Sequence, residues 1–271
     1  MKTILYNLLA LLTIVGMASC TKVIDVDLNE ANPQIVIEGE VSDQPETYWV
    51  KVSRTGNYIG REETPKVSGA VVTITDNNQT YTLQENPNEP GTYETSAFVG
   101  VPGTTYFLKV VVEGKEYTSQ STMPSELLDF ELRQTAYFAG DVTKDPGYYL
   151  QLFTTDPPNE DNYYQWRFTI NDTIKNKPDD IAVASDEWIQ EQINGFQAPY
   201  TFQAEDRVKF AMLAIPKETY EFYDALATLL FNDGGMFDPP PANPPGNING
   251  GIGIFSAVSI KSKDIVIVEK K

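Results

Sequence analysis

The sequence contains no histidine and only one cysteine among its 271 residues. The absence of histidine excludes Ser-His-Asp and Cys-His catalysis and zinc sites with imidazole ligands. The single cysteine, Cys20, has no partner for an internal disulfide, so the fold must be stabilised by packing. After Cys20 the apolar runs, such as residues 210–215, have the length of strands and are too short to cross a bilayer as a helix.

Basic residues are also scarce. The chain has 20 Lys and Arg against 38 Asp and Glu, which gives a net charge of −18 at pH 7. Such a surface repels the phosphates of nucleic acids, so we expect no nucleic-acid partner. The hydrophobic content of 41% and the aromatic content of 11% are sufficient for a real core. We interpret the acidic surface as a means of solubility for a protein outside the cytoplasm.

The N-terminus has the residue order of a secretory leader. Lys2 supplies a positive charge, residues 4–17 are mostly apolar, and small residues stand directly before Cys20. We therefore predict a cleavable signal peptide over residues 1–19. Cys20 would carry the lipid anchor, and residues 20–32 would form a tether. The alternative is an ordinary signal peptide with an accidental cysteine.

From Pro33 onward, apolar and polar residues alternate in short runs that are separated by turn residues. This pattern, with turns about every 8–12 residues, is typical of an antiparallel sandwich. We predict a mainly β fold that begins with an immunoglobulin-like or transthyretin-like β-sandwich over residues 33–123. The expected strands of this domain are 34–41, 48–54, 70–75, 80–83, 93–96, 106–112 and 115–121.

A proline within residues 123–125 predicts a boundary, because proline disfavours a preceding helix and interrupts central strands. We predict a second β-rich domain over residues 126–271 with one inserted α-helix at 217–231, where the apolar residues recur with helical spacing. Residues 237–251 are rich in Pro and Gly and predict an ordered surface loop. The expected strands of this domain are 128–132, 148–153, 164–170, 207–213, 252–259 and 264–268.

Several motifs follow one another along the chain in a recognisable order. They are Tyr48–Thr55 (YWVKVSRT), Val67–Asp76 (VSGAVVTITD), Gly91–Tyr93 (GTY), Asp156–Pro158 (DPP) with Asn162–Tyr164 (NYY), and the stretch from Pro240 to Ala257. In this order they resemble the domain of unknown function 4249 family of Bacteroidota lipoproteins. The resemblance covers nearly the whole chain after Cys20. It implies a lipid-anchored outer-membrane protein at the cell surface that accompanies a TonB-dependent receptor, and it implies no catalytic residues.

Three groups of residues are candidate sites. Asp156, Asn159 and Asp161 carry the oxygen ligands that Ca²⁺ prefers, although their spacing differs from that of a calcium loop and also suits a plain turn. No other cofactor is expected.

Aromatic residues in the irregular stretch 179–203 form the second candidate. Trp188, Phe196 and Tyr200 would present a ligand-binding surface on a loop, since such residues combine apolar area with a polar group. The alternative is ordinary core packing.

The Pro-rich loop is the third candidate, as a surface for contact with a partner. Its alternative is a packed structural loop whose glycines allow close backbone approach. The residues in question are Pro239, Pro240, Pro241, Asn243, Pro244 and Pro245.

Together these features predict a non-enzymatic protein that assists a TonB-dependent receptor in nutrient capture or uptake. Two other functions stay open. One is a surface glycan hydrolase that uses a carboxylate pair, for which no histidine is needed. The other is an adhesin-like structural module of the cell surface.

Overall fold

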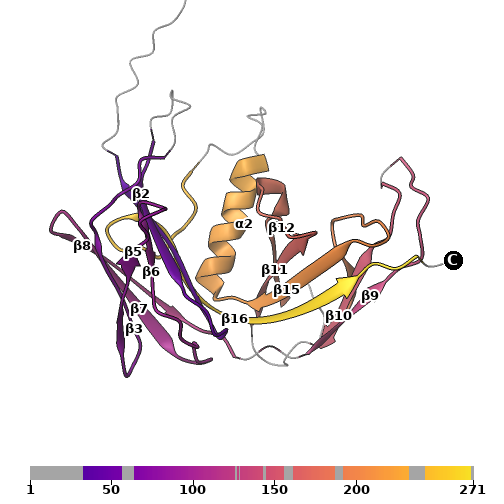
Figure 1. Ribbon diagram of the computed structural model, residues 1–271, viewed down its shortest axis with the longest axis horizontal. Coiled ribbons are helices and arrows are strands. Elements are labelled where there is room, and N and C mark those ends of the chain that lie inside the picture. Colours follow the sequence, from indigo (N-terminus) through magenta and orange to yellow (C-terminus); the bar gives the residue numbers. More distant parts are fainter. Residues whose placement is uncertain are drawn as a thin grey trace, which may run out of the picture. The chain divides into compact units, whose positions relative to one another are not determined.

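The chain adopts a mainly β fold with one α-helix among the described residues, as seen in a computed structural model (Figure 1). The structure describes residues 33–56, 64–125, 127, 129–142, 145–155, 161–186, 192–231 and 242–269. The predicted signal peptide, Cys20 and the tether lie outside these residues. No helix in the described ranges is long and apolar enough to cross a membrane.

The secondary-structure elements confirm the prediction of a mainly β fold with a helix at 217–231. In chain order they are β1 Ile35–Ser42, β2 Trp49–Arg54, β3 Val71–Thr75, β4 Thr80–Thr82, β5 Gln84–Glu85, β6 Thr92–Glu94, β7 Thr105–Val112, β8 Lys115–Thr122, β9 Phe130–Gln134, β10 Leu150–Thr155, β11 Tyr163–Ile170, β12 Thr173–Ile174, the 3₁₀ helix η1 Pro178–Asp180, β13 Ala182–Ser185, β14 Gln192–Gln197, β15 Arg207–Ala214, α2 Lys217–Phe231 and β16 Ile252–Val266.

The β7–β8 hairpin illustrates how the residue pattern produces these strands. In β7, Tyr106, Leu108 and Val110 are buried, and the residues between them point outward. The turn that follows has positive φ at both central residues, 51° at Glu113 and 82° at Gly114. This is the geometry of a type I′ turn, which matches the twist of paired strands.

The strands form three sheets. A nine-stranded sheet has the order β12-β11-β15-β16-β1-β2-β6-β5, with β13 also paired to β11. A four-stranded sheet has the order β4-β3-β7-β8, and a three-stranded sheet has the order β14-β10-β9. The β1–β16 pair is parallel, whereas the other strand pairs of the described residues are antiparallel.

Strand β16 corrects one expectation. The sequence predicts two strands, 252–259 and 264–268, but residues Ile252–Val266 form one continuous strand. Its first half pairs with β1 from Ile252 to Val258, and its second half pairs with β15 from Ser259 to Val266. One strand therefore joins the N-terminal and the C-terminal parts of the fold (Figure 1).

Two large hydrophobic cores lie on either side of the predicted boundary at residues 123–125. The N-terminal core comprises the buried residues from Ile35 to Met123 together with Ile248, Phe255 and Ala257. The C-terminal core comprises most of the buried hydrophobic residues from Leu127 to Ala214 together with Ile267. The division of the chain into two domains stays a prediction, because β16 runs through both parts.

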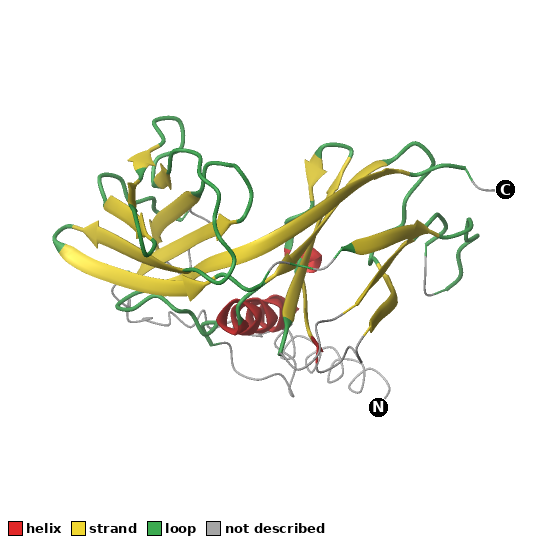
Figure 2. Ribbon diagram, turned by 90° about the horizontal axis from the view of Figure 1, so that it is seen from below, coloured by secondary structure: helices red, strands yellow, loops and turns green. Residues whose placement is uncertain are grey.

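Helix α2 lies against one face of the large sheet (Figure 2). Thr219 is its most buried residue, and the Thr219 hydroxyl lies 2.7 Å from the Ser256 hydroxyl of β16. Tyr220 packs against Tyr163 of β11 with ring centroids 5.1 Å apart. The stretch 179–203, expected to be an irregular loop, is a second correction because it contains β13 and β14.

Candidate functional site

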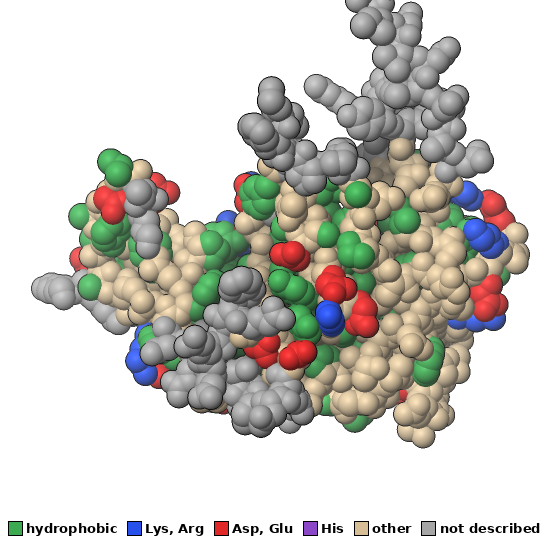
Figure 3. Space-filling model, turned by 180° about the vertical axis from the view of Figure 1, so that it is seen from behind, with side chains coloured by type: hydrophobic (Ala, Val, Ile, Leu, Met, Phe, Trp, Pro, Cys, Tyr) green, Lys and Arg blue, Asp and Glu red, His purple; other side chains and the backbone are tan. Residues whose placement is uncertain are grey.

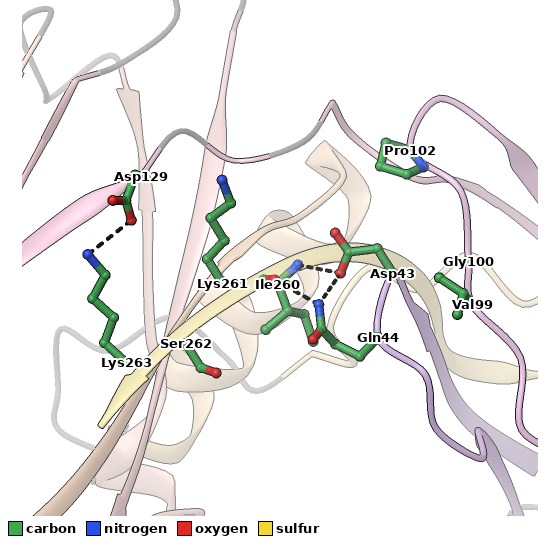
Figure 4. A pocket seen from close by; sticks show the side chains of 10 residues that line it. All are labelled: Asp43, Gln44, Val99, Gly100, Pro102, Asp129, Ile260, Lys261, Ser262 and Lys263. Carbon is green, nitrogen blue, oxygen red and sulfur yellow. Dashed lines mark hydrogen bonds and ion pairs between the residues drawn. The ribbon is translucent and has the colours of Figure 1, made fainter. Parts of the chain in front are cut away.

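A pocket of about 500 Å³ opens beside β16, at residues 260–263, which lie between the two strands that the sequence predicts. Figure 4 shows its walls. The lining residues are Asp43, Gln44, Val99, Gly100, Pro102, Asp129, Ile260, Lys261, Ser262 and Lys263. They come from the β1–β2 turn, the β6–β7 loop, the segment before β9, and β16.

The turn after β1 is fixed to β16 by side chains that continue the strand pairing. The Ile260 backbone N–H donates to Asp43 Oδ1 at 2.9 Å. The Gln44 side-chain amide donates to Asp43 Oδ1 at 2.8 Å and to the Ile260 carbonyl at 2.9 Å. Because these bonds satisfy backbone groups beyond the last β1–β16 pair, they hold the Asp43 carboxylate at the pocket.

Two lysines of β16 line the pocket. Lys263 forms an ion pair with Asp129 at 3.0 Å, contacts the Phe130 carbonyl, and lies 5.0 Å above the Phe130 ring. The hydrogen bond from Lys263 lowers the pKa of the Asp129 carboxyl. Lys261 lies two residues earlier and borders the same space (Figure 4). The carboxylate beside Lys263 therefore stays ionised at neutral pH.

The apolar wall is brought close by a glycine. Gly100 donates its backbone N–H to the Ser42 carbonyl at 2.9 Å. A Cβ at position 100 would lie 2.3 Å from the Ser42 oxygen and 2.6 Å from Met123 Cε, so no larger residue fits there. This close approach places Val99 and Pro102 opposite the charged residues.

Two buried tyrosines hold both walls from the inside. The Tyr48 hydroxyl lies 2.6 Å from the Ser42 carbonyl and 3.1 Å from the Phe98 carbonyl, and it also contacts the Gln44 carbonyl. The Tyr106 hydroxyl accepts from the Val101 N–H at 2.8 Å. Burial raises the pKa of both tyrosines, so both remain protonated at neutral pH.

A second polar cluster joins β1 to β11. Arg167 binds Glu40 with two hydrogen bonds of 2.8 and 2.5 Å, and both its Nε and Nη2 donate to the Gln165 side chain. Burial alone would lower the pKa of Arg167, but the Glu40 carboxylate raises it. Burial and Glu40 raise the pKa of Tyr223 in α2 to about 12. Glu40 is thus engaged by a bidentate partner.

Two of the predicted aromatic residues, Phe196 and Tyr200, pack against rings of the C-terminal core. Phe196 stacks on Trp166 with centroids 4.3 Å apart and is 40% exposed. Tyr200 donates to Asp180 at 2.6 Å and meets Phe168 edge to face. Burial is the main cause of the raised pKa of Tyr200, and the hydrogen bond to Asp180 raises it further. Trp188 lies outside the described residues, so the proposed ligand surface stays a prediction.

The described part of the Pro-rich loop is tied to the fold. Asn247 accepts from the Phe255 N–H at 2.9 Å and donates to the Phe255 carbonyl at 2.7 Å. Ile248 is buried in the N-terminal core. Asn243 and Pro245 are exposed and Pro244 is half-buried, whereas Pro239, Pro240 and Pro241 lie outside the described residues. The partner contact stays a prediction.

The calcium prediction is also untested. Asp156 and Asn159 lie outside the described residues, and Asp161 is exposed. Among the residues that the structure describes, no group of three or more His, Cys, Asp or Glu side chains is arranged to hold a metal ion.

Comparison with known proteins identifies the family. The family model described as "Domain of unknown function (DUF4249)" matches residues 21–264. The chain belongs to this family. A search of curated proteins finds no match to this DUF4249 chain.

The pocket residues of this DUF4249 protein are absent from the sequence predictions. Lys261 and Lys263 fall in the gap between two expected strands, and Asp43 reads as an ordinary turn residue. Two lysines two positions apart in a strongly acidic chain were the available signal, because alternate strand residues share one face.

Proposed function

We propose that the protein is a lipid-anchored accessory of a TonB-dependent outer-membrane receptor, and that it captures a small nutrient for uptake. The observation that carries the proposal is the pocket beside β16. Its charged side chains are held by hydrogen bonds and by the Lys263–Asp129 ion pair, which is the preorganised arrangement expected of a binding site.

Further support comes from the N-terminal sequence and the surface. Lipid attached to Cys20 would keep the folded part near the membrane, where receptors lie. Figure 3 shows acidic side chains gathered near the middle of one face, beside hydrophobic ones. An acidic surface favours a partner with a basic patch and speeds the encounter.

The test is affinity purification from native outer membranes after mild crosslinking. We expect a stoichiometric β-barrel receptor to co-purify with the tagged protein. The Cys20→Ala variant should leave the membrane fraction because it cannot be acylated. A folded, acylated protein that captures no receptor would contradict the proposal.

A second experiment asks whether the Pro-rich loop contacts the receptor. Replacement of residues 239–245 by a Gly/Ser linker should abolish receptor capture and leave cooperative unfolding unchanged. Unchanged capture would remove the loop from the proposed interface. Turnover of a surface glycan that is lost on changing one carboxylate would instead favour the hydrolase alternative.

A further inference from the structure

Strand β16 has a strand partner on only one side over its second half. β1 pairs with β16 as far as Val258, and from Ser259 to Val266 the paired strand is β15, on the other side. Within the described residues, no strand takes the place of β1 beside this second half. The pocket lies along the side that β1 has left, because its walls include Ile260, Ser262 and the turn after β1.

The direction of the backbone groups on this side follows from Ile260. Its N–H and its carbonyl bind side chains of the turn after β1, so both groups point away from β15. Alternate residues of a strand direct their backbone groups to the same side. Ser262, Asp264 and Val266, which are all exposed, therefore direct their N–H and carbonyl groups away from β15 as well. Among the described residues, none of these groups has a hydrogen-bond partner on that side.

Side chains close this row of backbone groups at both ends. At Ile260, Asp43 and Gln44 take the place of a neighbouring strand. At Val268, the Gln134 side chain donates to the backbone carbonyl at 2.6 Å and accepts from the N–H at 3.0 Å. Open backbone groups on a strand are a template for another strand. The row between the two closed ends has room for an extended peptide of about five residues.

The Asp43 carboxylate stands at one end of the row and has one oxygen available. Within the described part of the chain, both of its hydrogen bonds reach Oδ1, from the Ile260 N–H and from the Gln44 amide. Figure 4 shows the second oxygen turned away from these two bonds. Oδ2 can therefore accept from the N-terminal ammonium of a peptide, which would then run parallel to β16 as β1 does.

The lysines of the pocket are already matched by a carboxylate. Lys263 forms an ion pair with Asp129 at 3.0 Å. The hydrogen bond from Lys263 and, to a smaller extent, the charge of Lys261 lower the pKa of Asp129. The open backbone groups of β16 are therefore the main contacts that remain for a ligand.

From this arrangement we infer that the pocket binds a short peptide with a free N-terminus, which adds to the open side of β16 as a parallel strand. Hydrogen bonds to the backbone of Ser262, Asp264 and Val266 hold the peptide, and Asp43 Oδ2 binds its ammonium group. Such binding recognises the peptide backbone and lets most of the peptide side chains vary. This inference rests on the proposed function, for which it names the class of nutrient.

The test is calorimetric titration of the full-length acylated protein in detergent with the pentapeptide Ala-Thr-Val-Thr-Val. An N-acetylated form lacks the ammonium and stands for an internal segment of a partner protein. Two further forms carry N-methyl groups at the second and fourth residues or at the third and fifth, so that each blocks one edge of the extended peptide. We expect the unmodified peptide to bind at least about tenfold more tightly than the acetylated one, and one methylated form at least about tenfold more tightly than the other.

Variants assign the contacts on the protein. Ser262→Pro removes an outward N–H without removing a bond to β15, and it should weaken binding of the peptide by at least about fivefold. Thr82→Pro is the matched control. Thr82 is exposed on the edge strand β4, and the next residue, Leu83, donates its N–H to the Val72 carbonyl, so the Thr82 N–H also points outward. This control should bind the peptide as the natural protein does.

Asp43→Asn tests the contact with the N-terminus. Asn keeps an oxygen for the Ile260 N–H, so the turn should remain in place, and the preference for the unmodified over the acetylated peptide should disappear. Thermal unfolding checks that all three variants fold. If Ser262→Pro does not fold, the two methylated peptides still test the backbone contacts on the natural protein.

Equal affinity for the two methylated peptides, equal affinity for the unmodified and acetylated peptides, or equal affinity of folded Ser262→Pro and Thr82→Pro would overturn the inference. So would the failure of every peptide to bind the folded protein. If the receptor still co-purifies in that case, the ligand class is wrong and the proposed function stands. If the peptide binds as expected but no receptor is captured, the receptor proposal fails and the assignment of the pocket stands.

Discussion

The two hydrophobic cores of this protein use their aromatic residues in different ways. In the N-terminal core, buried tyrosine hydroxyls bind backbone groups of loops. Tyr48 contacts the carbonyls of Ser42 at the end of β1 and of Phe98 in the β6–β7 loop. Tyr93 donates to the Val67 carbonyl at 2.8 Å and accepts from the Ala70 N–H at 2.9 Å. The loops of this region, including both walls of the pocket, are thus fixed from inside.

In the C-terminal core, phenylalanine rings pack on one another. Phe168 meets Phe210 edge to face at 5.1 Å, and Phe130 meets Phe210 in the same way at 5.3 Å. Such contacts fill volume but do not fix the direction of a loop. The N-terminal tyrosines therefore fix loops through backbone groups, whereas the phenylalanines of the C-terminal core fill the volume beneath the sheet.

The largest expected loss of stability follows from a substitution at Gly253, where β16 pairs with β1. This residue has φ of 114°, and a Cβ there would lie 2.0 Å from the Ile37 carbonyl oxygen. Gly253→Val should break the β1–β16 pairing and destabilise the protein by more than about 4 kcal/mol, or prevent folding. Gly56→Ala, where a Cβ meets nothing within 4 Å, is the control. Similar urea midpoints for both variants would contradict this account.

The ion pair between β1 and β11 should also couple the two regions. Glu40→Gln, Arg167→Met and the double variant form a mutant cycle, for which we expect a coupling of about 1.5–3 kcal/mol in urea unfolding. The exposed pair of Arg207 and Asp172, with side chains 66% and 86% exposed, should give below about 0.5 kcal/mol. Equal couplings would mean that burial adds nothing to the Glu40–Arg167 pair.

Removal of one tyrosine hydroxyl from each region tests whether these hydroxyls fix the pocket walls. Tyr48→Phe removes a buried hydroxyl that lies within hydrogen-bonding distance of the Ser42 and Phe98 carbonyls, and it should destabilise the protein by about 1–2 kcal/mol, with weaker ligand binding. Tyr200→Phe loses a hydrogen bond to the half-buried Asp180 carboxylate and should cost about 1–2 kcal/mol without affecting the pocket. If both variants lose the same affinity, the hydroxyls do not fix the pocket walls.

Most strands and the helix can be predicted from the local pattern of apolar and polar residues. Alternating strands such as 106–112 and the helix at 217–231 are predictable because the periodicity of apolar residues records which side faces the core. Strands β13 and β14 cannot be predicted in this way, because they are short and contain polar residues. They form because β13 pairs with β11 and β14 pairs with β10. Pairing between distant strands leaves little mark on local sequence.

The pocket cannot be predicted from the sequence either, because it also depends on contacts between distant segments. Its lysines lie where β16 changes partner from β1 to β15, and polar residues there suggested a break between two strands. Asp43 gains its role only because Ile260, far along the chain, donates to it. A site assembled from a turn, a loop and a strand crossing is defined by tertiary contacts, so spacing alone cannot reveal it.

The smallest expected effect concerns pH and the loops of the N-terminal region. Glu85 accepts from the Gly91 N–H at 3.0 Å and from the Gly69 N–H at 2.9 Å, and these bonds lower the pKa of its carboxyl. Because the folded pKa lies below the unfolded one, the stabilisation is complete above the unfolded pKa and is lost as pH falls through the folded pKa.

Glu85→Gln keeps one side-chain oxygen and loses the charge, so it should destabilise the protein by less than about 1 kcal/mol at pH 7. The difference in unfolding free energy from the natural protein should shrink as the pH falls below about 4, since the natural carboxyl is then protonated as well. Glu269→Gln, at an exposed position near the C-terminus, provides the baseline in the same urea series. A difference that stays constant across this range would mean that the two glycine N–H groups gain nothing from the charge.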